Sequence, residues 1–127
     1  MEDNIYLSSM TYFHAARHLD LVSDKSKSKS LHGHNFKVST RIKFTNEARD
    51  NLDSLKERIK KQVNNLNYSL LNDHISEPSD INIANKIAEL LEDSSPVSVS
   101  VCSTEIEGAN IELPDRNEIW RSFTFQA

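Results

Sequence analysis

Hydrophobic and polar residues alternate along several stretches of this chain, which is the pattern of β-strands that bury one face. In residues 35–44, the clearest case, Phe, Val, Thr and Ile share one parity, while Lys, Ser and Arg fill most of the other. Residues 5–16 and 119–125 mix β-forming and polar residues, and residues 97–102 alternate regularly after Pro96. The pattern therefore predicts four strands, two toward each end of the chain.

Two stretches between these strands have the three- and four-residue spacing of amphipathic helices. Apolar positions recur in this way through residues 47–66, and Thr45-Asn46 before them offers an N-cap. Residues 80–91 repeat the pattern after turn-forming residues around Pro78. We therefore predict one α+β domain over residues 1–127, in the order ββααββ, with two helices on one face of a four-stranded antiparallel sheet.

Composition narrows the class of protein. The chain is 37% hydrophobic and 27% charged with a formal net charge of -4, so no surplus of Lys and Arg favours nucleic acid or an acidic membrane as partner. No apolar run approaches the roughly 20 residues of a membrane helix, and the acidic N-terminus does not resemble a secretory signal. The single cysteine, Cys102, excludes an intrachain disulfide, and we expect it in the core of a cytoplasmic protein.

Two histidines flank Gly33 at the start of the second predicted strand. Residues two apart on a strand point to the same face about 7 Å apart, so His32 and His34 can bind one metal ion. Zinc accepts neutral imidazole nitrogens, and a catalytic zinc site needs a third protein ligand beside an open position. A chance pair of surface histidines has the same spacing, so the spacing alone leaves both interpretations open.

The surroundings of this pair carry a resemblance to a known family. Residues 13–19 (Phe-His-Ala-Ala-Arg-His-Leu), a polar loop and residues 31–36 (Leu-His-Gly-His-Asn-Phe) resemble consecutive motifs of the 6-pyruvoyl-tetrahydropterin synthase and 6-carboxytetrahydropterin synthase family. Supporting similarities follow in order along the chain: Leu71-Asn72-Asp73, Pro78-Ser79, Asn82-x-Ala84, Val99-x-Val101, Thr104 and Gly108.

The resemblance implies a fold, a cofactor and partners. The fold is the tunnelling fold, in which the sheets of several subunits close into an oligomeric barrel with active sites at subunit interfaces. The cofactor is zinc held by three histidines, and the substrate is a pterin-type small molecule, dihydroneopterin triphosphate. A homo-oligomer built on trimers is expected, with trimer, tetramer and hexamer left open. Among the family's enzymes the short chain is most similar to 6-carboxytetrahydropterin synthase, which serves the 7-deazaguanine (queuosine) pathway.

Several residues depart from the family pattern at the metal site. The family's first zinc histidine aligns with Arg17, and a shift of one residue on a regular strand turns a side chain to the other face. We expect His18 to join His32 and His34 as the third ligand through a β-bulge. His14, or no third histidine, are the alternatives.

The proton-transfer residues of the family are also replaced. Its cysteine aligns with Ser28, and its Asp–His dyad aligns with Asn67 and Tyr68. Asp73-His74 lies near the dyad position and could supply a replacement, although two exposed turn residues would look the same. Ser28, Asp73 and His74 are therefore the candidate catalytic residues.

The family's pterin-anchoring glutamate aligns with Ser103. Glu105, with the same strand parity, could instead accept two hydrogen bonds from an amino-pyrimidine edge, next to Thr104. A solvated charge at a strand end is the alternative for Glu105. The sequence thus predicts a zinc-dependent pterin synthase-like lyase, or alternatively a degenerate member that binds a pterin or purine-like ligand or acts as a scaffold.

Overall fold

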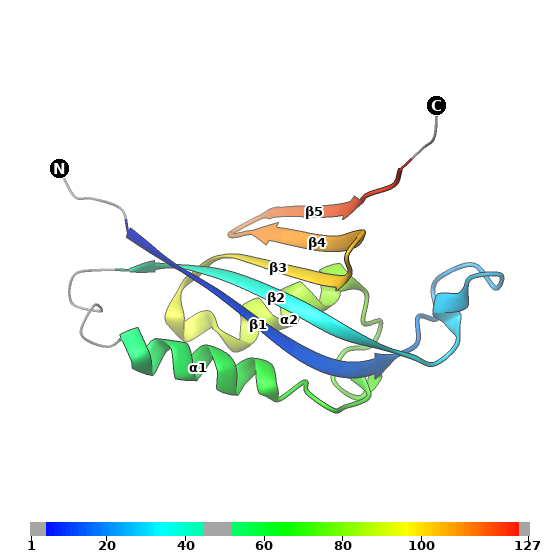
Figure 1. Ribbon diagram of the computed structural model, residues 1–127, viewed down its shortest axis with the longest axis horizontal. Coiled ribbons are helices and arrows are strands. Elements are labelled where there is room, and N and C mark those ends of the chain that lie inside the picture. Colours follow the sequence, from blue (N-terminus) through cyan, green and yellow to red (C-terminus); the bar gives the residue numbers. More distant parts are fainter. Residues whose placement is uncertain (1–4, 45–51, 125–127) are drawn as a thin grey trace.

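Five antiparallel strands form one sheet in this protein, and two helices cover one of its faces (Figure 1). The computed structural model describes residues 5–44 and 52–124. The strands follow one another across the sheet in chain order: β1 (Ile5–Arg17), β2 (His32–Phe44), β3 (Pro96–Thr104), β4 (Glu107–Glu112) and β5 (Arg116–Arg121). The helices are α1 (Leu52–Asn64) and α2 (Asp80–Leu90). The predicted α+β class is confirmed, and the oligomeric barrel stays a prediction.

The predicted count of four strands is wrong. The chain turns directly after β3 and returns as β4, which pairs with β3 along its length. This strand was missed because its sequence, Glu-Gly-Ala-Asn-Ile-Glu, has weak β-formers around Gly108. The last strand, β5, begins at Arg116 and ends at Arg121, earlier than the predicted 119–125, of which residue 125 lies outside the described residues.

The core lies between the helices and the sheet face that carries the apolar parity of residues 35–44. Phe36, Val38 and Ile42 of β2 are each at most 2% exposed, in agreement with the predicted alternation. Phe13 is the register partner of Phe36, and their rings stack with centroids 4.8 Å apart. Burying one such side chain contributes about 1.5–3 kcal/mol, so this pair ties β1 to β2 beneath the candidate site.

The helices agree with their predicted spacing, and α2 begins at a well-formed cap. The Ser79 hydroxyl accepts a hydrogen bond from the Asn82 N–H at 3.3 Å, and the helix ends one residue before the predicted boundary at Leu91. The described part of α1 begins at Leu52, so the predicted residues 47–51 and the expected cap at Thr45-Asn46 lie outside the described residues.

A loop of residues 18–31 joins β1 to β2 at one end of the sheet (Figure 1). It contains a short 3-10 turn, η1 (Lys27–Lys29), and is fixed by the Leu19 N–H, which donates to the Ser28 carbonyl at 2.8 Å. The Glu77 carboxylate accepts from the N–H groups of Asp20 and Leu21 at 2.8 and 2.7 Å. These bonds hold the loop beside the N-terminus of α2.

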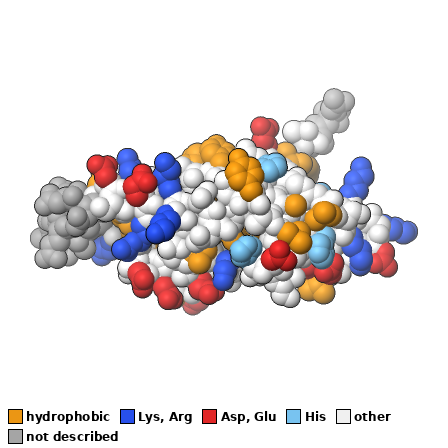
Figure 2. All heavy atoms as spheres, turned by 90° about the horizontal axis from the view of Figure 1, so that it is seen from below, with side chains coloured by type: hydrophobic (Ala, Val, Ile, Leu, Met, Phe, Trp, Pro, Cys, Tyr) orange, Lys and Arg blue, Asp and Glu red, His pale blue; other side chains and the backbone are white. Residues whose placement is uncertain are grey.

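Charged side chains of both signs are interspersed on the face seen in Figure 2, where histidine and hydrophobic side chains gather on one half. This view therefore offers no large surface of a single charge. Within residues 5–44 and 52–124, no helix has the length and apolar content needed to cross a membrane.

Candidate functional site

His32 and His34 lie side by side at the start of β2, on the sheet face that also carries Phe36. Their ring centroids are 4.7 Å apart, with the rings nearly perpendicular, and the His34 ring meets the Phe36 ring edge-on at 5.4 Å. Burial lowers the pKa of His34, and the nearby charges of Arg17 and His32 lower it further. The neutral imidazole that results is the form that binds a metal ion.

Arg17 stands next to this pair, directly opposite His32 in the β1–β2 register. It is only 3% exposed, and its guanidinium carbon lies 5.1 Å from the centroid of the Phe36 ring. Its Nη1 donates to Asp80 Oδ1 at 2.7 Å and to the Pro78 carbonyl at 2.9 Å. A guanidinium is always charged and cannot ligate a cation, so the residue aligned with the family's first zinc histidine opposes a zinc ion.

His18, the expected third ligand, is directed elsewhere. The β1–β2 ladder runs from Ile5 to Arg17 without a register shift, so the β-bulge expected for His18 is not present in it. His18 Nδ1 lies 2.8 Å from Asp20 Oδ1 and 3.5 Å from the side-chain nitrogen of Asn72.

The second alternative, His14, is exposed on β1 with its ring 6.4 Å from that of Tyr68. Across the described residues, no three His, Cys, Asp or Glu side chains come close enough to hold a metal ion. The residues present do not fit a three-histidine zinc centre in this arrangement, and zinc stays a prediction.

Asp80 connects three elements at this end of the sheet. Its Oδ1 accepts from Arg17 of β1, and its Oδ2 accepts from the Ser103 hydroxyl of β3 at 2.7 Å. Ser103 is 4% exposed and stands where the resemblance places the pterin-anchoring glutamate. A carboxylate does lie beside Ser103, but it is that of Asp80 in the first turn of α2. It already accepts hydrogen bonds from Arg17 and Ser103. Sequence reasoning read Asp80 only as a helix start and missed this contact.

A cavity of about 590 Å³, here the outer-face cavity, opens on the sheet face opposite the helices. Both predicted substrate-binding residues, Thr104 and Glu105, line it together with Tyr12, Asn35, Lys37, Cys102 and Trp120. The Thr104 hydroxyl oxygen accepts from the Ile106 N–H at 3.2 Å, which shapes the turn that presents Glu105. Two aromatic rings beside a carboxylate suit a flat heterocycle with N–H donors. The aromatic members were missed because alternation identifies outward-facing residues but not which of them share a cavity.

Cys102 lines this outer-face cavity and is not in the core, so the expected place of the cysteine is wrong. It lies on the parity of β3 opposite to the buried Val99 and Val101. Partial burial raises the pKa of the Cys102 thiol, with the Lys37 charge opposing this effect. The group is therefore a neutral thiol near pH 7 and a poor nucleophile.

The three candidate catalytic residues fall in two places. Ser28, in η1, lines a smaller cavity of about 220 Å³ together with Arg17 and Asp80, which we call the Arg17 cavity. Asp73 ends the short turn η3 (Leu71–Asp73) and His74 caps it; both are exposed, and neither lines the two cavities described so far. The structure thus brings Ser28 to Arg17 but does not bring Asp73 and His74 to Glu105, and their catalytic roles stay predictions.

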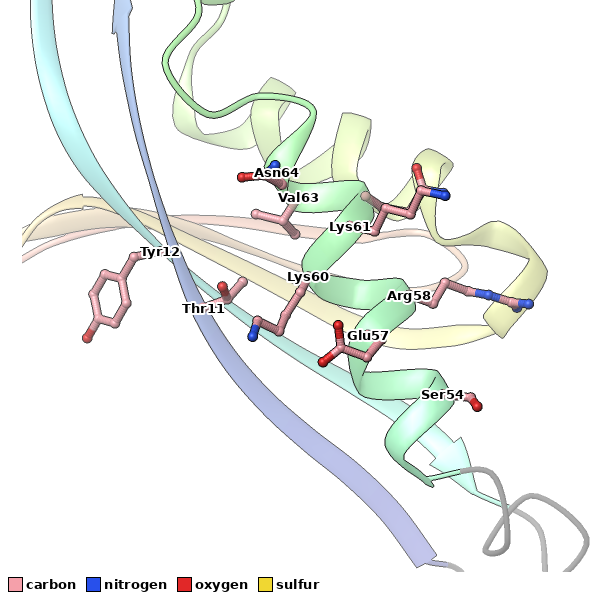
Figure 3. A pocket seen from close by; sticks show the side chains of 10 residues that line it. Thr11, Tyr12, Ser54, Glu57, Arg58, Lys60, Lys61, Val63 and Asn64 are labelled. Atoms are coloured by element: carbon pink, nitrogen blue, oxygen red, sulfur yellow. The ribbon is translucent and has the colours of Figure 1, made fainter.

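A third cavity, of about 760 Å³, runs between β1 and α1 (Figure 3). In Figure 3, Lys60 and Glu57 extend from α1 toward Thr11 and Tyr12, while Arg58 points away from β1. Although it is the largest of the three, it contains none of the residues singled out by the sequence, and we assign no function to it.

Comparisons with known proteins agree with this fold. The sequence model of the family described as 6-pyruvoyl tetrahydropterin synthase matches residues 6–113, whereas no curated protein matches the chain. Among solved structures, the 6-pyruvoyl tetrahydropterin synthase of Caenorhabditis elegans is 15% identical, with 95% of this chain and 97% of that chain covered and a TM-score of 0.68. An uncharacterized protein from Wolinella succinogenes is 12% identical, with 88% and 99% covered and a TM-score of 0.64. The Plasmodium falciparum synthase is 15% identical, with 97% and 100% covered and a TM-score of 0.52.

Proposed function

Because the chain belongs to the 6-pyruvoyl tetrahydropterin synthase family, we propose that it binds a pterin-type or purine-like ring in the outer-face cavity. The observation that carries this proposal is the meeting of Glu105 and Thr104 with the rings of Tyr12 and Trp120 around one cavity. The Glu105 carboxylate would accept two hydrogen bonds from the N–H groups of an amino-pyrimidine edge. The outer-face cavity has a volume of about 590 Å³, which falls in the range of roughly 300–1,000 Å³ usual for small-molecule sites.

A second candidate function is the zinc-dependent lyase reaction on dihydroneopterin triphosphate, of the 6-carboxytetrahydropterin synthase type in 7-deazaguanine synthesis. The close pair of His32 and neutral His34 favours it. Against it, Arg17 occupies the position aligned with the family's first zinc histidine, and Ser28 cannot replace a thiolate as a base. Ligand binding without this chemistry therefore has the stronger support.

A direct test uses the chain's single tryptophan, Trp120, which lines the outer-face cavity. We expect neopterin and guanine, which share the amino-pyrimidinone edge, to quench Trp120 fluorescence saturably, and adenine to do so much more weakly. Equilibrium dialysis gives the affinity without optical interference from the pterin. Failure of neopterin, guanine and adenine alike to bind would overturn the proposal.

The contribution of Glu105 is tested by Glu105→Gln, which keeps its size and removes its charge. Losing a charged acceptor costs about 1.5–3 kcal/mol, so the affinity for neopterin should fall by roughly 10- to 150-fold. The matched control is Glu89→Gln on the exposed face of α2, which should bind as the parent protein does. Turnover of dihydroneopterin triphosphate, measured with and without added zinc, decides the second candidate.

We further propose a homo-oligomer built on trimers, in keeping with the family. β1 and β5 are the two edges of the sheet, and Ile119 on β5 is 75% exposed. An edge strand presents unpaired backbone N–H and C=O groups, with which a strand of another subunit can pair. Light scattering coupled to size-exclusion chromatography measures the assembly, and a monomer at all concentrations would contradict the proposal.

A further inference from the structure

Arg17 is buried with hydrogen-bonding capacity left unused. Within the described residues, its Nη1 donates to Asp80 and to the Pro78 carbonyl. Its Nε is fully buried and has no partner among the described residues. Buried donors are nearly always paired, and a charged donor left without an acceptor is costly. The position therefore calls for an acceptor that the described part of the chain does not supply.

The Arg17 cavity is lined by further donors. Besides Arg17 it is bordered by three serines and by the start of α2: Ser26, Ser28, Ser79, Asp80 and Ile81. The first N–H groups of a helix have no acceptor within the helix, and they concentrate a partial positive charge there. The Ser79 hydroxyl accepts from Asn82, which leaves its own proton free to be donated.

Two carboxylates also line the cavity, and each already has a partner. Asp80 accepts from Arg17 and Ser103, and Glu107 lies 3.1 Å from Arg121 Nη2. Two arginines and two carboxylates cancel in formal charge, so the free donors and the helix N-terminus decide which ligand fits. A cation would face unpaired N–H groups, whereas an oxyanion would satisfy them.

We propose that the Arg17 cavity binds an oxyanion, either a phosphate or a carboxylate, with the Arg17 guanidinium and the Ser28 and Ser79 hydroxyls as donors. The volume of about 220 Å³ suits a single phosphate or carboxylate group. Glu105 does not line this cavity, although Trp120 lines both cavities, and the proposal does not depend on ring binding in the outer-face cavity. It also gives Arg17 a role at the position where the family's sequence pattern has a metal ligand.

The test titrates the full-length protein with inorganic phosphate and, separately, with acetate, at constant ionic strength maintained with chloride. Nuclear magnetic resonance follows the Arg17 Nε–H signal and the amides of Asp80 and Ile81. We expect saturable shifts at these three groups, and the anion with the lower dissociation constant identifies the source of the oxyanion. Shifts that do not saturate, or that centre elsewhere, would show an adventitious ion only and would overturn the proposal.

Variants locate the site. Arg17→Lys keeps the charge but removes the Nε–H fork, so phosphate or acetate binding should weaken at least tenfold. Ser28→Ala changes a half-buried loop residue whose side chain makes no hydrogen bond to another described residue, so it should weaken binding by a few-fold. It keeps the test decisive if Arg17→Lys does not fold. Ser8→Ala, exposed on β1, is the matched control and should bind normally. Unchanged binding in Ser28→Ala and in a folded Arg17→Lys would refute the assignment.

Glu105→Gln separates the two proposals. This variant is expected to lose affinity for neopterin and to bind phosphate as the parent does. If ring binding fails while phosphate still saturates the Arg17 cavity, the oxyanion site stands alone.

Discussion

Removing the Asp80 carboxylate should destabilise the protein more than any other single change to an acidic side chain described here. The side chains of Arg17 and Asp80 are 4% and 13% exposed and lie 2.7 Å apart. Asp80→Ala would leave the buried guanidinium with one carbonyl partner and the Ser103 hydroxyl with none. Breaking a buried ion pair from one side costs about 3–5 kcal/mol. Most of that cost is the uncompensated charge that remains.

Less severe substitutions of Asp80 and Arg17 divide this loss of unfolding free energy into its contributions. Asp80→Asn retains one acceptor and should lose roughly 1.5–3 kcal/mol. In the double variant Arg17→Met with Asp80→Asn, no buried charge remains, so its loss should be clearly smaller than the sum of the two single losses. Such a departure from additivity is the signature of a direct pair.

Urea unfolding, followed by far-ultraviolet circular dichroism at fixed pH, measures these differences through the linear dependence of the unfolding free energy on urea. Asp73→Ala is the control because Asp73 is exposed, and it should change stability by no more than about 0.5 kcal/mol. A loss below about 1 kcal/mol for Asp80→Ala, or strict additivity in the double variant, would refute the argument that this pair organises the end of the sheet.

Three other predictions follow. The pKa of His34 is lowered from 6.5 in the folded protein, so the unfolded chain binds more protons as the pH drops below 6.5. The unfolding free energy, measured by urea midpoints, should therefore fall as the pH drops through this range. His34→Gln should reduce this fall, whereas His74→Gln should not. Cys102, with its raised pKa, should react with iodoacetamide more slowly than glutathione near neutral pH, and bound neopterin should slow it further, as read by mass spectrometry. Purified protein dialysed against zinc should hold much less than one ion per chain, and Arg17→His should raise that amount. One zinc per chain, lost in both His32→Ala and His18→Ala, would instead establish a three-histidine site and favour the lyase candidate.

The elements that the sequence predicted well are those whose burial follows from a local pattern, either strand alternation or helical spacing. The pattern of residues 35–44 predicted which face of β2 is buried, because the apolar residues all fall on alternate positions. β4 carried no such pattern, because Gly108 packs where a Cβ would meet the Val101 carbonyl oxygen at 2.5 Å and the Trp120 ring at 2.9 Å. Close packing of two strands, rather than β-propensity, selects glycine there. The contact between Arg17 and Asp80 spans 63 positions of the chain, and it arises only when α2 docks against the end of β1.

Arg17 stands where the family resemblance places a metal ligand, and its charge changes what the neighbouring groups can do. In a three-histidine site the imidazoles are neutral and the ion supplies the positive charge. Here the positive charge belongs to the protein, is compensated by Asp80, and contributes to the lowered pKa of His34. A divalent ion at His32 and His34 would meet this fixed cation at close range in a partly buried setting, where Coulomb repulsion is strong. The charge of Arg17 therefore opposes zinc binding at His32 and His34. A histidine-to-arginine exchange at this position favours an anion that pairs with the guanidinium.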